Sequence, residues 1–485
     1  MAELSEEPAT FAKVLKSREV IALGFGAMIG WSWVLMTGVW LTNAGTLGTL
    51  IAFAVGGFAV ALIGLTYSEL ASAMPKAGGE HVYTQRALGH RWSFACTWAL
   101  LFSYVNVCLF EAVALPSAVE YLFPDIRMGT LWTFIGSDVD LGFVLVGSSA
   151  AALVTWVNVL GIRTAAILQS IVTVLIVISG VLLISGAALF GDFENAKPLI
   201  ATPATGILSV LIMVPALLVG FDVIPQSAEE IDLPPNRIGK LLVISVGCAV
   251  AWYVLIAFAV GLGLNAEQQA STTMATADAA QSLWQHPWAG ALLVLGGIGG
   301  IMTSWNAFVV GGSRVLYALA KSNHVPAVFA RLHPKYKTPY VGIAAIGVLS
   351  MIAPLFGKTI LVWLINSGSF ATTVAFLFVA ISFLVLRRTE PDMPRPFKVS
   401  HPRLVGYGAV ILSLGLLSAF LPWSTSSLQW PEEWLTIVVW SCLGLVLLAR
   451  YEFLKTRRYS SSPICPASAP DVGGRNRSVR RGARS

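Results

Sequence analysis

The feature of this sequence that most constrains its fold is a succession of apolar runs. Each run is close to the about 20 residues that a helix needs to cross the hydrocarbon core of a bilayer. The runs show no two-residue alternation of the kind that marks a membrane β-barrel. We therefore predict an all-α integral membrane protein with twelve transmembrane helices, at 20–41, 48–73, 92–118, 141–159, 164–190, 206–229, 239–264, 287–320, 340–356, 359–386, 404–422 and 434–454.

The composition excludes several classes of protein. With 56% hydrophobic and only 12% charged residues, the chain is more apolar than a soluble domain can be. The five cysteines show no disulfide or zinc spacing, and the six histidines all lie in polar segments or at the ends of apolar runs. We expect no enzyme activity and no cofactor. The net charge of +6 comes largely from basic residues beside the spans, so we expect no nucleic-acid partner.

The distribution of basic residues predicts the orientation. If the N-terminus is cytosolic, all but three of the 31 Lys and Arg residues fall on the cytosolic side, as the positive-inside rule requires. Both termini are then cytosolic, and we expect a multi-pass protein of the plasma membrane. The predicted parts are a cytosolic leader at 1–19, a ten-helix core at 20–400, helices 11 and 12 at 401–456, and a disordered basic tail at 457–485.

The first predicted span carries three glycines near the middle of the membrane. Gly24, Gly26 and Gly30 stand where a regular helix would favour alanine or leucine. We interpret this stretch as a break in the helix. The alternative is that the glycines serve only close packing between helices.

The sixth predicted span has a similar interruption. Pro215 lacks a donor for the helical hydrogen bonds, and Gly220 and Pro225 follow it. Breaks at matching positions of two halves, helices 1–5 and 6–10, are typical of an inverted-repeat transporter whose substrate binds between the broken helices.

Four stretches of sequence carry a resemblance to a known family. They are GAMIG at 26–30, YSELASAMPKAGGEHVYTQRALG at 67–89, GFDVIPQSAEEIDLPPNRIGK at 220–240 and SRVLYALAKSNHVPAVFARLHPKYKTP at 313–339. Over most of residues 18–400 the chain resembles the amino acid-polyamine-organocation (APC) superfamily of permeases. The resemblance implies the LeuT-like fold, a five-plus-five inverted repeat with broken helices 1 and 6.

The resemblance also implies a substrate site at the two breaks. In the first, the N–H groups of Gly30, Trp31 and Ser32 would hold a carboxylate, and the Met28 carbonyl would face the amino group. In the second, carbonyls of Ala216 and Val219, beside Gly220, would meet the same amino group. Trp31 and Ser32 depart from the small residue and glycine of the family motif. Ala216 replaces the family's aromatic gate, so Trp31 or Trp33 is the alternative gate.

The coupling ion stays open between Na⁺ and H⁺. The fifth span, 164–190, lacks the lysine that some proton-coupled relatives carry. Thr303 and Ser304 resemble the helix 8 part of the sodium site in sodium-coupled LeuT-like proteins, and hydroxyl oxygens suit a hard cation. The alternative is that both hydroxyls bond to the backbone of their own helix.

Acidic residues inside the bilayer are costly, and two of them need a reason. Asp222 follows the second break and is a candidate for proton coupling, for binding a cationic substrate, or for capping the broken helix. Glu111 is a second coupling candidate, or a structural partner of another polar residue. A third group gathers at predicted cytosolic helix ends, where an arginine facing carboxylates would form a latch or a static pair: Glu69, Glu229, Glu230 and Arg314.

The sequence therefore predicts a secondary active transporter for an amino acid, working by alternating access and either ion-coupled or exchanging. The alternative is a carrier of polyamines or other organic amines, which the intramembrane acids would favour. The expected partners are a small-molecule substrate and membrane lipid, and the oligomeric state is left open. An ion channel is disfavoured because no filter motif is present.

Overall fold

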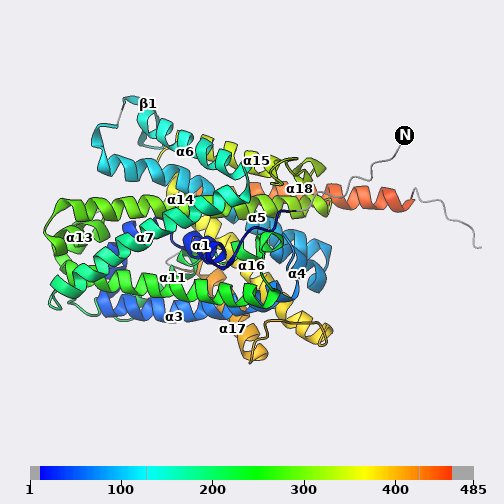
Figure 1. Ribbon diagram of the computed structural model, residues 1–485, viewed down its shortest axis with the longest axis horizontal. Coiled ribbons are helices and arrows are strands. Elements are labelled where there is room, and N and C mark those ends of the chain that lie inside the picture. The colour runs from blue at the N-terminus through cyan, green and yellow to red at the C-terminus, as the bar shows by residue number, and fades with distance from the viewer. Residues whose placement is uncertain (1–10, 127, 273, 425–426, 461–485) are drawn as a thin grey trace, which may run out of the picture.

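The computed structural model describes residues 11–126, 128–272, 274–424 and 427–460. Most of this part is helical, and the long helices run side by side (Figure 1). Within it, nine helices are long and apolar enough to cross a membrane: α3 (Thr37–Ala73), α5 (His90–Leu122), α6 (Leu141–Val159), α7 (Ile162–Phe190), α11 (Pro235–Gly263), α14 (Pro287–Lys321), α16 (Ile360–Thr389), α17 (Pro402–Ala419) and α18 (Glu432–Ser460). The prediction of a mainly helical protein with many apolar helices of membrane-spanning length is confirmed.

Several of these helices begin where the sequence supplies a suitable first residue. Proline is the first residue of α11, α14 and α17, a position where its missing N–H would have no helical partner in any case. The run predicted at 141–159 coincides with α6. Helix α18 continues to Ser460, past the predicted start of the tail at 457, and residues 461–485 lie outside the described part.

The other predicted spans are interrupted or short. The span at 20–41 consists of α1 (Ser17–Met28), α2 (Ser32–Leu35) and the start of α3. The span at 206–229 is divided into α8 (Thr205–Leu211), α9 (Val214–Leu217) and α10 (Val223–Gln226), followed by the 3-10 turn η2 (Ala228–Glu230). The span at 340–356 is α15 (Tyr340–Ile352) extended by the 3-10 turn η4 (Ala353–Phe356).

Two helices meet at Gly45, within the residues labelled α3. Gly45 has φ +76° and ψ 171°, which is not helical, so the end of the first predicted span and the second predicted span are separate helices joined at a kink. A side chain here would be strained, and its Cβ would lie 2.6 Å from the Pro198 carbonyl oxygen. The loop after α7 therefore crosses directly over this kink, where the Ala201 N–H donates to the Ala44 carbonyl at 3.1 Å.

Packing places α14 at the centre of the bundle. Helix α14 packs against α5 and α7, α3 packs against α11, and α16 packs against α5. The broken helix α1 lies among α7, α11 and α14. Helices α17 and α18 lie at the periphery, and the apolar face of α18 is largely exposed, as expected of a helix that faces lipid.

Shorter elements cover the two ends of the bundle (Figure 1). One end, the hairpin side, carries the turn η1 (Pro124–Ile126), an antiparallel hairpin and two short helices: β1 (Thr130–Phe134), β2 (Ser137–Asp140), α12 (Ala266–Ser271) and α13 (Ala275–Trp284). The opposite end, the α4 side, carries α4 (Gly79–Leu88) and the turn η3 (Ala327–Ala330).

Candidate functional site

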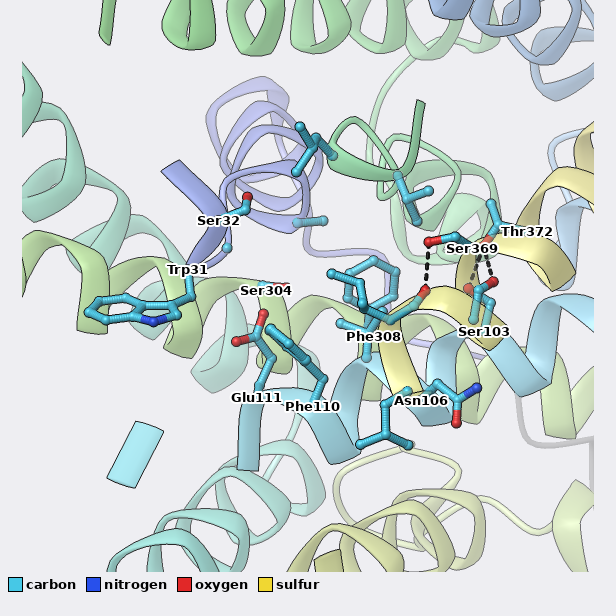
Figure 2. A pocket seen from close by; sticks show the side chains of 18 of the residues that line it. Trp31, Ser32, Ser103, Asn106, Phe110, Glu111, Ser304, Phe308, Ser369 and Thr372 are labelled. Carbon is cyan, nitrogen blue, oxygen red and sulfur yellow. Dashed lines mark hydrogen bonds between the residues drawn. The ribbon is translucent and has the colours of Figure 1, made fainter. Parts of the chain in front are cut away.

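A cavity of about 70 Å³ lies between the two interrupted helices and the central helices α5, α14 and α16 (Figure 2). Polar groups line part of it, and apolar side chains form the rest of its wall. The polar lining residues are Ser32, Ser103, Asn106, Glu111, Ser304, Ser369 and Thr372. The larger apolar ones are Trp31, Val107, Phe110, Leu217, Val219, Phe308, Leu364 and Ile365.

The first break supplies one wall of the cavity. Helix α1 ends at Met28 and α2 begins at Ser32, so the backbone of 29–31 is outside regular helix. Met28, Gly30, Trp31 and Ser32, which the resemblance in sequence assigns to a candidate substrate site, all line this cavity. Trp33, the alternative gate, is instead fully buried and packs edge-on against Trp252.

A tyrosine that the sequence did not single out connects the two breaks. The Tyr253 hydroxyl of α11 lies 3.0 Å from the Met28 carbonyl oxygen, 3.3 Å from that of Leu217, and 2.9 Å from the Ser32 hydroxyl. One phenol proton serves one acceptor at a time, so one of the two carbonyls is left for another donor. The available signal was that Tyr253 is the single phenol in an otherwise apolar span.

The second break is closed by its own acid. Gly220 has φ +128°, and its N–H donates to Asp222 Oδ1 at 2.9 Å. The Tyr104 hydroxyl of α5 donates to Asp222 Oδ2 at 2.5 Å. Asp222 is fully buried and is not among the described residues that line the cavity. Both of its oxygens are therefore occupied in holding the break together.

The remaining residues predicted at this break are placed differently from one another. Val219 lines the cavity, and Gly220 packs against the backbone of Ala27 without lining it. Ala216 belongs to α9, and its side chain lies outside the described part of the structure. The second break thus contributes less of the cavity wall than the first.

Glu111 contributes a carboxyl group to the cavity wall. It is the only ionisable side chain among the described lining residues. Its side chain is buried and lies close to the Ser304 hydroxyl (Figure 2). Its Oε2 has no hydrogen-bond partner among the described atoms. A buried carboxylate oxygen without a donor is costly, so this atom is poised to receive a proton or a ligand.

The two hydroxyl groups proposed as sodium ligands, those of Thr303 and Ser304, do not line the same cavity. The Thr303 hydroxyl donates to the carbonyls of Gly300 at 3.0 Å and Gly299 at 3.2 Å, within its own helix. Ser304 lines the cavity beside Glu111, whereas Thr303 does not line it.

Three uncharged amide side chains form a hydrogen-bond network that links α1 to its neighbouring helices. The Gln169 side chain of α7 donates to the Ala22 carbonyl at 3.1 Å and accepts from Asn306 at 2.8 Å. Asn306 in turn accepts from Asn158 at 2.9 Å. Three helices are thereby tied to α1 by uncharged groups, and the signal for them was the placement of amide side chains inside apolar runs.

The α4 side of the bundle is closed. Arg314 and Glu230, both buried, form a two-point ion pair with distances of 2.7 and 2.9 Å. Phe11 covers the Arg314 guanidinium, with 5.8 Å from its carbon to the ring centre. Leu15 pairs with Ile231 in a short parallel bridge. Of the acidic residues expected to gather around this arginine as a latch or a static pair, Glu69 pairs instead with Arg395, at 3.1 Å, and with Arg387.

The hairpin side, by contrast, is open. A larger cavity of about 1170 Å³ adjoins the central one and shares Trp31, Ser32 and Phe110 with it. Its lining reaches Tyr121 and Lys358 near the hairpin end of the bundle. A solute from the hairpin side therefore meets the central cavity, whereas one from the α4 side meets a packed ion pair.

Comparison with known proteins identifies the family to which this architecture belongs. The amino acid permease family matches residues 15–444. The chain belongs to this family. The APC resemblance seen in the sequence is thereby confirmed, and the permease is a membrane transporter of amino acids and not an enzyme.

Individual relatives span most of the permease. It is 27% identical to the branched-chain amino acid permease BcaP of Bacillus subtilis, over 91% of this chain and 92% of that protein. It is 24% identical to the methylthioribose transporter of the same organism, over 93% and 95% of the two chains. It is 26% identical to the human cationic amino acid transporter 4, over 81% of this chain and 63% of that protein.

Proposed function

We propose that the permease carries its substrate by alternating access, with the substrate held in the central cavity between the two breaks. The observation that carries this proposal is that the non-helical backbone at 29–31 and the carboxyl group of Glu111 line the same central cavity. Backbone groups outside a helix are free to bind the charged ends of an amino acid. Glu111 adds a titratable group within reach of the same space.

We further propose twelve spans arranged as two inverted halves of five, followed by two peripheral helices. Nine full-length helices, the interrupted stretches around α1 and around α8–α10, and the shorter α15 supply these spans. The interruptions fall in the first and sixth of them, which is the pattern of an inverted repeat.

The proposed orientation places the α4 side in the cytosol and the hairpin side outside. Two of the three basic residues expected outside, Lys197 and Lys358, pair there with Glu194 and Glu120. The N-terminal leader and the basic tail would then both be cytosolic, in the plasma membrane. In this orientation the structure corresponds to an outward-facing state, sealed on the cytosolic side by Arg314 and Glu230.

For coupling, we propose that Glu111 carries a proton. A carboxylate enclosed in a membrane cavity without a cationic partner is stabilised when it binds a proton. Asp222 is a weaker candidate because Tyr104 and the Gly220 N–H already occupy its oxygens. Sodium is also a weaker candidate, because the Thr303 hydroxyl is bonded within its own helix.

The lining favours a neutral amino acid with an aliphatic side chain. Phe110, Phe308 and Leu364 give the wall apolar surface. Polar groups lie on both sides of Phe308, with Ser304 and Glu111 on one side and Ser369 and Thr372 on the other (Figure 2). A branched-chain substrate, as named for one relative, fits the apolar surface. The alternative is a cationic amine or amino acid, which would pair its ammonium with an ionised Glu111.

Uptake by the full-length permease in proteoliposomes tests these proposals. A panel of labelled aliphatic and cationic amino acids and polyamines is offered under a pH gradient, a sodium gradient, or neither. We expect aliphatic amino acids to accumulate under the pH gradient alone. Preferential uptake of amines would establish the alternative substrate class, and accumulation driven only by sodium would refute proton coupling.

A further inference from the structure

A second buried acid lies on the α4 side, away from the substrate cavity. Glu80 stands in the first turn of α4 and is fully buried, as is Gln226 in α10. The Gln226 side-chain amide donates a hydrogen bond to Glu80 Oε2. Neither residue is among the described residues that line the central cavity. The two side chains link α4 to the short helix that follows the second break.

This acid–amide pair has two oxygens without a donor. Glu80 Oε1 and Gln226 Oε1 are both buried, and neither has a hydrogen-bond partner among the described residues. Leaving two buried acceptors unsatisfied is costly. A single proton on Glu80 Oε1 would change this, because the resulting O–H could donate to Gln226 Oε1. Acid and amide would then share two hydrogen bonds in a closed ring.

The surroundings of Glu80 also disfavour a negative charge. The groups that act on it include no cation in the described part of the chain; they are Asp222, Tyr67 of α3, Tyr83 of α4, and Cys96 and Tyr104 of α5. The neighbouring His81 is engaged with Thr97, Ser93 and Ser322. Burial raises the pKa of Glu80 well above its ordinary value, and the charge of Asp222 raises it further; these two effects outweigh those of the nearby backbone and of the Tyr67 hydroxyl, which lower it.

We propose that Glu80 and Gln226 form a proton-binding site that is separate from the substrate cavity. In the closed state of the α4 side, Glu80 is a neutral acid paired with the Gln226 amide. Movement of α10 away from α4 separates the pair and admits water, and the carboxyl O–H then transfers its proton to water on the α4 side. Opening on this side is thereby linked to proton release.

The protonated carboxyl has a direct spectroscopic signature. Infrared spectra of the full-length permease in liposomes at neutral pH should show the carbonyl stretch of a buried neutral acid. We expect this band to persist in the Glu111→Gln variant, which keeps the Asp222 charge beside Glu80, and to lose the Glu80 contribution when Glu80→Gln is added. A Glu111→Gln variant without the band would overturn the proposal, and this outcome does not depend on how well any Glu80 variant folds.

The link to opening is tested by exchange of saturating substrate at equal concentrations on both sides. In the parent, we expect exchange to become faster as the pH on the α4 side rises, because ionised Glu80 favours the open state. Glu80→Gln should remove that dependence. The matched control is Glu390→Gln, which removes a partly exposed α4-side acid paired with Arg86 and should keep the parent profile.

This second readout is independent of proton coupling by Glu111, because exchange requires no driving gradient. A Glu80→Gln variant that exchanges with the parent's dependence on α4-side pH would refute the linkage. A loss of gradient-driven accumulation in Glu111→Gln, with the α4-side pH dependence intact, would support both proton sites as separate elements.

Discussion

The two breaks in the bundle differ in how their polar groups are used. At the second break, the two carboxylate oxygens of Asp222 accept hydrogen bonds, one from the Tyr104 hydroxyl and one from the Gly220 N–H. At the first, Glu111 faces the cavity with one oxygen unpartnered among the described atoms. Both acids are buried, so burial alone does not distinguish a structural acid from a functional one. The distinction lies in whether the hydrogen-bonding capacity is already satisfied by the protein.

The largest effect that separates the breaks is expected from alanine at their glycines. Gly220→Ala would place a side chain at φ +128° with its Cβ 2.8 Å from the Ala27 carbonyl carbon. Backbone strain of this kind costs on the order of 1–3 kcal/mol before the clash is counted. We expect little folded protein, measured as yield and thermal unfolding in detergent.

Gly30→Ala is the matched variant at the first break. Its Cβ would meet the Glu111 Oε1 atom at 2.9 Å and Ser304 Oγ at 3.5 Å, which are side-chain atoms that can move. This variant should fold and lose substrate affinity. Equal loss of folded protein in both variants would mean that the two breaks tolerate a side chain equally poorly. That result would contradict the difference between the breaks described above.

The next effect concerns the acids themselves. Glu111→Gln should retain exchange but lose accumulation driven by a pH gradient, by about 5- to 150-fold if the coupling is of ordinary strength. Asp222→Asn should keep that accumulation and lose stability by about 1–3 kcal/mol, since one of its two acceptor oxygens becomes a donor. Uptake in proteoliposomes and thermal unfolding check the two parts. The reverse assignment of effects would make Asp222 the coupling acid.

The tyrosines offer a finer test of the same difference. Tyr104→Phe removes the hydroxyl donor from a buried carboxylate and should cost about 1–3 kcal/mol of stability. Tyr253→Phe frees carbonyls beside the cavity that water can reach, so its stability cost should stay below about 1 kcal/mol while substrate affinity changes. Chemical unfolding and binding measurements on both variants decide the matter. A greater stability loss in Tyr253→Phe would contradict the assignment.

The smallest effect is expected at Thr303. Its hydroxyl bonds to carbonyls of its own helix, so Thr303→Ala should change stability by less than about 1 kcal/mol. Replacing sodium by choline should leave uptake unchanged in the parent and in the variant alike. Sodium-dependent uptake in the parent that Thr303→Ala abolishes would restore the predicted sodium site.

The sequence predicts the spans well where one apolar run makes one helix. The run at 141–159 is α6 because polar residues or glycine bound it at both ends. The breaks are harder to place. The span is interrupted on both sides of α9, just before Pro215 and again around Gly220, whose φ is positive. The sequence pointed to Pro215 and Gly220 together, but it did not predict that they mark two separate interruptions.

The sequence could predict only those residues of the candidate site that are neighbours within one stretch of chain. Met28, Gly30, Trp31 and Ser32 were found because they follow one another in a motif. Which of two acids faces the cavity depends on partners from other helices, such as Tyr104, which is far from Asp222 in the sequence. No local pattern encodes that pairing. The same holds for Tyr253, whose three contacts come from two different breaks.

The pairing of Leu15 with Ile231 also bears on how a cell makes this protein. The ribosome delivers the strand-like residues near Leu15 first, yet their partners at Glu230 and Ile231 emerge only after several helices have entered the membrane. The partners of Phe11, which are Arg314 and Tyr317, are synthesised later still. A nascent chain that ends before Arg314 would lack both the Phe11 contact and the ion pair with Glu230. The α4 side can therefore close only after most of the helices have been made.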